Sequence, residues 1–349
     1  MQVSKEFLQI IEKIESEHLP PPSCDDEPLT ENVDNNMNSK KLIIIFHDES
    51  TFHANDDQNV MWAEKGMKPV KPKSQGAGIM VSDFIEEYDG WLKLSDNDYK
   101  VAKQLKLSTK QEARVLLEIG EKRDGYWNNE KFMSQMKNAM KICKFKYPAE
   151  KYDVLWLFDQ SSGHTKKADN ALNVNVMNVK PGGKQPVLRD TIFKKDGKDV
   201  KQKMYFTESG KKVPKGLRLV LEERGYDVNG LNQEGLCKLL SADPDFAGEK
   251  SIVEQFILNE GHMVMFLPKL HCELNAIEQC WCLAKKHTRS VCNYSIVGLR
   301  KSVCPSLDTV KTQTIRKFIR KAREYIRAYR EGHTIGCGLA TALKQYKSH

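Results

Sequence analysis

Three short apolar runs constrain the fold of this chain of 349 residues more than any other feature. They cover residues 42–46, 154–158 and 263–267, and each contains β-branched or aromatic side chains. Runs of this length and content are typical of strands that are buried on both faces of a sheet. The chain is therefore expected to build an α/β fold around a central sheet.

Each apolar run leads to an acidic residue. Asp48 and Asp159 come at or just past the ends of the first two runs, and Glu278 lies on a segment beyond the third. A carboxylate placed at the edge of a buried sheet needs compensation, and three such charges repel one another unless cations lie between them. Hard oxygen ligands of this kind hold Mg²⁺ or Mn²⁺ in sites that transfer phosphoryl groups with two ions. The three acids alone therefore predict a metal-dependent nuclease.

The order of the expected elements predicts a topology. They are strands at 42–46, 77–84 and 90–94, a strand or helix at 113–119, a helix at 128–144, a strand at 154–158, a helix at 251–258 and a strand at 263–267. The third acid then falls on a further helix, whose one face carries Glu278, Trp281 and Lys285. This is the ribonuclease H-like order, in which helices flank a mixed sheet. The expected fold also contains a helical insertion between the second and third acids.

The segment around the third acid carries a motif. Residues 273–278 are Glu-Leu-Asn-Ala-Ile-Glu, preceded by Phe-Leu-Pro at 266–268 and followed by Trp281. This pattern resembles the third-acid signature of mariner-type DDE transposases, in which an acidic residue and Leu-Asn-Pro-Ile-Glu precede a Trp. Ala276 replaces the usual Pro of that family. Trp281 is expected to pack in the core.

The first and second acids lie in segments that resemble the other two catalytic segments of that family. The first segment is Asp-Glu-Ser at residues 48–50. The second is Asp-Gln at 159–160 with His164 shortly after it, whereas the family usually has Asn after the Asp. The stretch between the second and third acids is far longer than in the family. The resemblance covers about residues 40–290, interrupted by the insertion.

The resemblance implies a catalytic domain at residues 40–290 that cleaves and transfers DNA strands as a transposase does. It marks Asp48, Asp159 and Glu278 as the catalytic residues and as the ligands of two Mg²⁺ or Mn²⁺ ions. DNA is the implied partner, a homodimer is one option for the assembly, and the implied location is the nucleus, with the cytoplasm as the other option. His164 either orients a phosphate or a water, or is a polar loop residue without a role.

Two alternatives from other classes stay open. Residues 1–39 are expected to form one short helix and a linker, whereas family members carry paired helix-turn-helix modules ahead of the catalytic domain. The chain is therefore expected to be a truncated copy, a partial gene model or a domesticated protein, and the alternative function is DNA binding without catalysis. A ribonuclease H-like exonuclease is disfavoured, because its first acids are spaced Asp-x-Glu. Asp48 and Glu49 are adjacent, so they point to opposite faces of a strand.

The insertion covers about residues 165–250. Its first half is rich in Lys, Gly and Pro and is expected to be loop-like and basic. Its second half is expected to form two short helices around a turn that contains Gly, within residues 216–240. This arrangement resembles a SAP-type DNA-binding hairpin, and a plain structural hairpin is the competing interpretation.

The net charge of +8 is unevenly distributed. The last 65 residues hold 15 Lys and Arg against three Asp and Glu, so they carry +12. A helix expected at 312–330 has an apolar stripe, and basic side chains fill its other faces. The basic helical segment 291–349 is therefore predicted to contact DNA phosphates. The residues chosen for that contact are Arg316, Arg320, Arg323 and Arg327, and a solvated helix face is the competing interpretation.

No stretch reaches the roughly 18 apolar residues that a membrane span needs, so no membrane partner is expected. The N-terminus lacks the features of a signal peptide. The nine cysteines are an odd number without a framework spacing, which fits reduced thiols inside a cell. A zinc site at His271, Cys272, Cys280 and Cys282 is disfavoured, because Cys-x-Cys is not the usual spacing of a structural zinc site.

Overall fold

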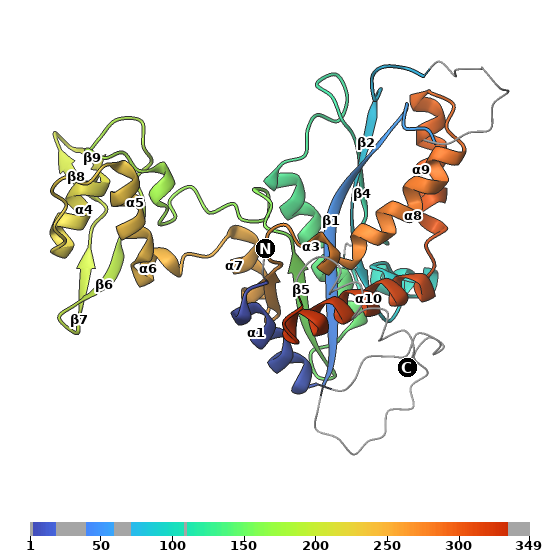
Figure 1. Cartoon of the computed structure of the whole chain (residues 1–349), viewed down its shortest axis with the longest axis horizontal. Coiled ribbons are helices and arrows are strands. Elements are labelled where there is room, and N and C mark those ends of the chain that lie inside the picture. Colours follow the sequence, from blue (N-terminus) through green and yellow to red (C-terminus); the bar gives the residue numbers. More distant parts are fainter. Residues whose placement is uncertain (1–2, 19–39, 59–70, 108–109, 334–349) are drawn as a thin grey trace. The chain divides into compact units, whose positions relative to one another are not determined.

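The computed structural model describes residues 3–18, 40–58, 71–107 and 110–333. The chain divides into two compact units (Figure 1). One contains Met1–His164 and Ile257–His349, and the other is Thr165–Phe256. We call them the sheet unit and the insert unit. The linker expected within residues 19–39 lies outside the described residues. Among the described residues, no helix is both long and apolar enough to cross a membrane.

The sheet unit is built around a six-stranded sheet with the order β10-β5-β1-β2-β3, in which β4 also pairs with β2. β1 is antiparallel to β2 and parallel to β5, and β5 is parallel to β10. An antiparallel meander that continues into parallel strands beside its first strand is the ribonuclease H-like arrangement, so the expected fold class is confirmed. The strands are β1 (Lys41–His53), β2 (Gly78–Glu86), β3 (Gly90–Trp91), β4 (Val115–Glu118), β5 (Tyr152–Phe158) and β10 (Met263–Phe266).

Helices cover both faces of this sheet. The side chains of Leu42, Ile44 and Phe46 join one core with α1, α8, α9 and α10. On the opposite face, the His47 ring packs against Phe132 of α3. The alternation along β1 therefore decides which helix each side chain meets. The helical elements of the sheet unit are α1 (Lys5–Ser16), α2 (Asp96–Gln104), α3 (Asn129–Lys146), η2 (Cys272–Leu274), α8 (Ala276–Ser290), α9 (Ile296–Asp308) and α10 (Thr312–Arg330), and α7 (Ile252–Asn259) contains the boundary between the units.

The first strand is longer than the sequence predicts. It was expected at 42–46, but it continues to His53 through a polar stretch that pairs with β2. The pairing of β1 with β5 ends earlier, at Phe46. Asp48 therefore lies inside a strand, just past the point where its parallel neighbour ends. Residues 113–119, left open as a strand or a helix, contain the strand β4.

The insert unit has its own apolar core and contains more strands than expected. The prediction that its first half is loop-like is wrong, because two antiparallel hairpins form there. Short turns with Asp-Gly and Ser-Gly connect the strands, and both glycines have positive φ, as tight hairpin turns require. The second half is helical, as expected. The elements are η1 (Val174–Val176), β6 (Thr191–Lys195), β7 (Lys198–Gln202), β8 (Tyr205–Glu208), β9 (Lys211–Pro214), α4 (Leu217–Arg224), α5 (Gln233–Ala242) and α6 (Pro244–Ala247).

Helix α10 spans the predicted residues, but two of the four arginines that were predicted to contact DNA do not face solvent. Arg316 is buried and donates to the backbone carbonyls of Glu87 and Tyr88. Arg323 forms ion pairs with Glu87 and with Glu15 of α1. The prediction that these two arginines contact DNA is therefore wrong. They neutralise buried acceptors and help to hold α1 and β2 against α10.

We predict that Arg323→Ala lowers the free energy of unfolding of the sheet unit by about 3–5 kcal/mol, because it leaves the buried Glu87 carboxylate unpaired. Tryptophan fluorescence in a urea titration measures this unit alone, since all five Trp residues lie outside 165–256. Arg320→Ala on the same helix is the control, because the Arg320 side chain is 67% exposed. Equal stability of the two variants would contradict a structural role for Arg323.

Candidate active site

Helix α8 fastens the part of β1 that carries the first acid. The side-chain amide of Asn275, the residue before the helix, donates to the backbone carbonyl of His47 at 3.1 Å. Further along the helix, the indole Nε1 of Trp281 donates to Asp48 Oδ2 at 3.0 Å. Asn275 and Trp281 are both buried, so water does not compete for these bonds. The motif around the third acid therefore holds β1 at two points.

The third acid lies on the same helix and meets the first. The carboxyl groups of Asp48 and Glu278 are hydrogen-bonded to each other. Asp48 is only 8% exposed, and burial raises its pKa to about 8, with further increases from the charges of Glu278, Glu49 and Asp159. Burial also raises the pKa of Glu278. The charge of Lys285 lowers this pKa, and the charge of Asp159 raises it further. A hydrogen bond between two carboxyl groups needs a proton, so without a cation this pair retains one near neutral pH.

A neighbouring acid on β2 has the cation that Asp48 lacks. Asp83 lies directly opposite Asp48 in the β1–β2 register and is buried. Arg114 donates from Nε to Asp83 Oδ2 at 2.6 Å, so this buried charge is paired. Among the described residues, no Lys or Arg forms an ion pair with Asp48. Its side chain accepts hydrogen bonds from Trp281 and from the backbone of Glu49, and it shares one with Glu278.

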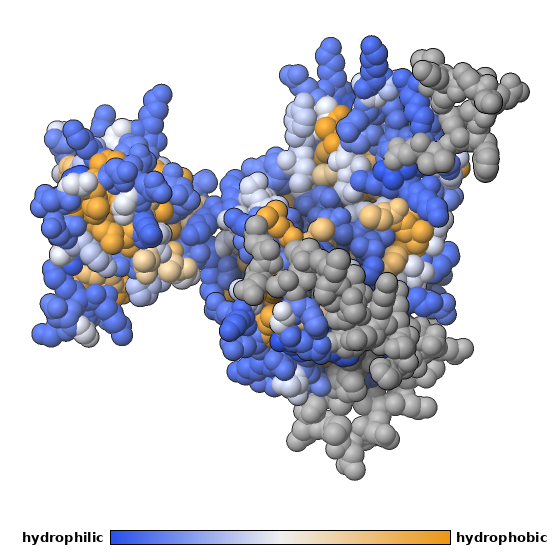
Figure 2. All heavy atoms as spheres, in the orientation of Figure 1, coloured by the Kyte–Doolittle hydropathy of each residue, from blue (hydrophilic) through white to orange (hydrophobic). Residues whose placement is uncertain are grey.

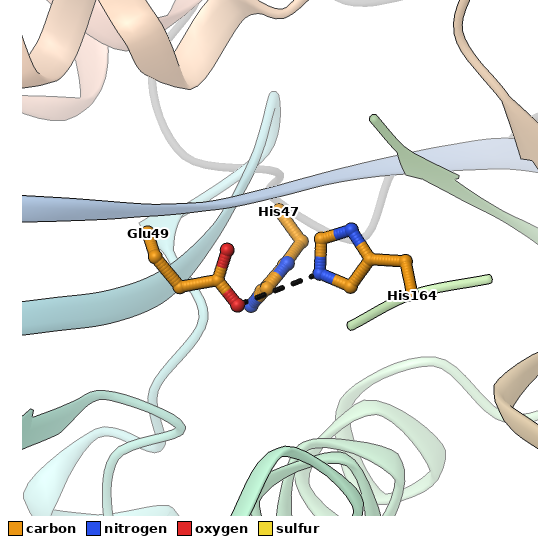
Figure 3. Close-up of side chains that lie close together, drawn as sticks. All are labelled: His47, Glu49 and His164. Carbon is orange, nitrogen blue, oxygen red and sulfur yellow. Dashed lines mark ion pairs between the residues drawn. The ribbon is translucent and has the colours of Figure 1, made fainter. Parts of the chain in front are cut away.

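The second acid is held by His164, whose ring also faces Glu49 (Figure 3). His164 Nδ1 lies 2.5 Å from Asp159 Oδ1, and its Nε2 lies 3.5 Å from Glu49 Oε1. Burial alone would lower the pKa of His164, but its bonds with Asp159 and Glu49 raise that pKa to about 9. The imidazole is therefore a cation at neutral pH: its Nδ1 donates to Asp159, and its Nε2 faces Glu49 as an ion pair. Burial opposes ionisation of Asp159, yet the His164 bond holds the Asp159 pKa below its ordinary value.

One group of side chains resembles a compact metal site. Ligand atoms of His47, Glu49 and His164 all lie within 4.8 Å of one another, which no other group of three His, Cys, Asp or Glu side chains achieves in the described part of the chain. His164, however, directs both nitrogens to carboxylates. His47 Nε2 bonds to Ser82 Oγ at 2.8 Å, and Ser82 donates onward to Gln135. This group is therefore a hydrogen-bonded support for Asp159, which Trp127 extends by donating to Glu49 Oε1 at 2.8 Å.

A cavity of about 530 Å³ lies beside two of the three acids. Asp159 and Glu278 line it, together with the loop that follows β10. The side chain of Asp159 is 45% exposed, whereas Asp48 is buried and does not line the cavity. The cavity therefore opens onto Asp159 and Glu278.

The structure decides several points that the sequence left open. Trp281 packs in the core as expected, and it also donates to Asp48. His164 is buried and bonded to Asp159, so the interpretation without a role is wrong. Ala276 takes the first position of α8, where Pro is favoured, and the helix begins there without it. Trp127 and Arg114 were missed, because neither lies in a motif and their partners are distant in sequence.

The long spacing between the second and third acids also has a structural origin. The insert unit begins directly after His164, and the chain re-enters the sheet unit at Ile257. Without the insert unit, β5 and β10 are connected by the short segments 159–164 and 257–262 of the sheet unit.

The cysteines of the alternative zinc site are divided between the buried Cys280 and the exposed Cys272 and Cys282.

Comparisons with known proteins give a distant likeness. No protein-family model and no curated protein matches the chain. The similar solved structures include the Mos1 mariner paired-end complex with Mn and the Mos1 transposase paired-end complex with left transposon end. Both are 11% identical to this chain, with TM-scores of 0.43 and 0.42. The match covers 83% of this chain and 55% of the other, so the chain spans about half the length of these structures.

The pKa shifts at the site predict how stability depends on pH. Between the ordinary value of 3.8 and about 8, the folded chain keeps an Asp48 proton that the unfolded chain has lost. That contribution to stability is present at low pH and disappears as the pH rises to about 8. His164 acts in the same direction between 6.5 and about 9. Both groups therefore make the metal-free protein less stable as the pH rises above neutrality.

We predict that the thermal midpoint measured in EDTA falls between pH about 6.5 and about 9, and that it falls less in Asp48→Asn, where only the His164 contribution is left. Added Mg²⁺ should raise the wild-type midpoint more at the upper end of this range, because the ion must displace the Asp48 proton. Tryptophan fluorescence measures both effects. An identical pH slope in Asp48→Asn would exclude Asp48 as the titrating group.

Proposed function

We propose that this chain is a nuclease of the mariner DDE transposase type, which cleaves and transfers DNA strands with divalent ions held by Asp48, Asp159 and Glu278. One observation carries the proposal: Asp48 and Glu278 form a hydrogen-bonded pair of carboxyl groups, and the charge of Asp159 raises the pKa of both. No Lys or Arg in the described part of the chain forms an ion pair with Asp48. The ribonuclease H-like sheet and the motif that contains Glu278 support it. DNA is then the partner, and the nucleus the place of action.

The donor set fits Mg²⁺ or Mn²⁺. All three groups offer hard oxygen ligands, which both ions prefer. The oxygens of Asp48, Asp159 and Glu278 do not all lie within 4.8 Å of one another, so one ion would not reach all three carboxylates where they lie here. When bound, such ions activate a water or a 3′-hydroxyl and stabilise the leaving oxygen of an in-line displacement.

The residues around the acids prepare them for this role. Trp281 fixes the Oδ2 oxygen of Asp48 and so orients its carboxyl group. His164 occupies one oxygen of Asp159 and keeps that group ionised. Supporting bonds of this kind orient metal ligands. No side-chain nucleophile is required, because the attacking group is a water or the end of a DNA strand.

The test is nicking of supercoiled plasmid DNA by the full chain in Mn²⁺. We expect Asp159→Asn and Glu278→Gln each to lower the rate by on the order of 100-fold or more, since even supporting residues of metal sites contribute 10–100-fold. Asp153→Asn is the matched control. Asp153 lies on β5, the strand that leads to Asp159, but it forms ion pairs with Lys40 and His18 and is not one of the three acids. This variant should nick like the wild type.

Two results would contradict the proposal. Nicking that persists in Asp159→Asn and Glu278→Gln would come from another site or from a contaminant. DNA binding without any nicking by the wild type in Mn²⁺ or Mg²⁺ would favour the alternative, a DNA-binding protein without catalysis.

A further inference from the structure

Several basic side chains of α10 form ion pairs or hydrogen bonds inside the sheet unit. Arg316 and Arg323 are engaged with β2 and α1, as described above. Arg330, near the end of the helix, lies 3.5 Å from Glu15 of α1. These side chains cannot neutralise phosphates without abandoning buried or partly buried partners. Among the basic residues of α10, Lys317, Arg320, Lys321 and Arg327 are exposed, and exposed lysines also gather in the insert unit.

Unpaired lysines gather on the first hairpin of the insert unit. Lys194, Lys195, Lys198 and Lys201 all lie on β6 or β7 and are exposed. Their side chains form no hydrogen bond or ion pair with any residue that the structure describes. Figure 2 shows hydrophilic residues over the end of this hairpin. The hairpin therefore presents four solvated ammonium groups within two short strands.

Two exposed acids, Asp196 and Asp199, lie on the hairpin itself, so its four lysines leave it with a net charge of +2. Several other acidic residues of the insert unit hold basic side chains that fasten the unit together, so they are not available to the hairpin. Arg224 of α4 pairs with Asp243 and Asp245. Lys215 pairs with Glu223, close to the end of the second hairpin. Residues 165–215 hold 13 Lys and Arg against five Asp and Glu, so this half of the unit keeps a strong positive charge.

The register of the hairpin sorts its side chains between two faces. Thr191, Phe193 and Gln202 are buried and share one face, which attaches the hairpin to the unit. Ile192 pairs with Lys201 on the other face, followed by Lys194 and its partner Asp199. Lys195 and Lys198 pair with each other next to the turn, on the same face in the register as Phe193, and both are exposed there. A two-stranded ribbon of this kind fits the major groove of B-DNA, which is about 12 Å wide, and its lysines can reach the phosphates on either side.

We propose that the β6–β7 hairpin is a binding surface for double-stranded DNA that acts on phosphates without regard to sequence. The inference rests on the proposed function for the identity of the polyanion, but it concerns a different surface from the three acids. The outward face carries Ile192, Lys194, Asp199 and Lys201, and it lacks the Asn, Gln and Arg side chains that most often read bases. Its contribution is therefore electrostatic, and it depends on salt.

The test uses the full chain in EDTA, so that binding is measured without cleavage. The change is Lys194→Gln, Lys195→Gln, Lys198→Gln and Lys201→Gln together. We expect affinity for duplexes of unrelated sequence to fall at least tenfold at about 0.1 M salt. The slope of log K against log salt should become shallower by about 0.9 for each lysine that contacts a phosphate. Fluorescence anisotropy from about 50 to about 200 mM salt measures both quantities.

Two matched variants control for charge and folding. The same four positions changed to Arg should bind like the wild type, because the charge is retained. A second quadruple Gln variant removes the exposed lysines Lys100, Lys122, Lys137 and Lys141 of the sheet unit, with the same change in net charge. It should change affinity by less than about threefold. Equal weakening by both Gln variants would reduce the effect to net charge and overturn the inference.

The outcomes separate this inference from the proposed function. Unchanged DNA affinity of the hairpin variant overturns the inference, whatever the wild type does in the nicking assay. Tighter binding of single strands or RNA than of duplex DNA by the wild type also overturns it. Weaker, salt-shifted duplex binding by the hairpin variant supports the inference, even if the wild type fails to nick DNA and the proposed function falls.

Discussion

Asp48 is a buried acid in the middle of the central strand, and no Lys or Arg among the described residues pairs with it. Burial and the nearby acids raise its pKa to about 8. The neighbouring elements all contact or flank this residue. Helix α8 supplies the Trp281 donor and the carboxyl group of Glu278, and β2 supplies Asp83, which is paired with Arg114. A fold can retain an unpaired buried carboxylate if it stays protonated or if a cation binds to it. The fit to divalent ions follows from this constraint.

The two aspartates of the candidate site are tuned in opposite directions. Asp48 is protonated more readily than usual because it is buried among acids, whereas His164 keeps Asp159 ionised. The cation that does so is itself fixed by Glu49, on the opposite face of β1 from Asp48. Adjacent residues of one strand therefore support the site from both sides of the sheet. Divergent pKa shifts in neighbouring acids are a usual feature of functional sites.

The sequence predicted the sheet because apolar runs are local signals. The motif around Glu278 is also local, and the assignment of the three acids to one site stays a prediction. The strand predicted from the sequence was shorter than β1, because residues 47–51 are mostly polar and resemble a loop, and only their pairing with β2 makes them a strand. The hairpins of the insert unit were missed for a similar reason: their outward faces are polar and their strands are short. The partners of Arg316 and His164 depend on elements that only the tertiary fold brings together. No local pattern could have identified them.

The most direct test of the account is the position of Mn²⁺ in crystals of the full chain, located by anomalous scattering. The account predicts ions ligated by Asp48, Asp159 and Glu278, with the proton between Asp48 and Glu278 displaced. Mn²⁺ bound instead to His47, Glu49 and His164 would contradict it, and so would acids that remain hydrogen-bonded to each other at saturating Mn²⁺.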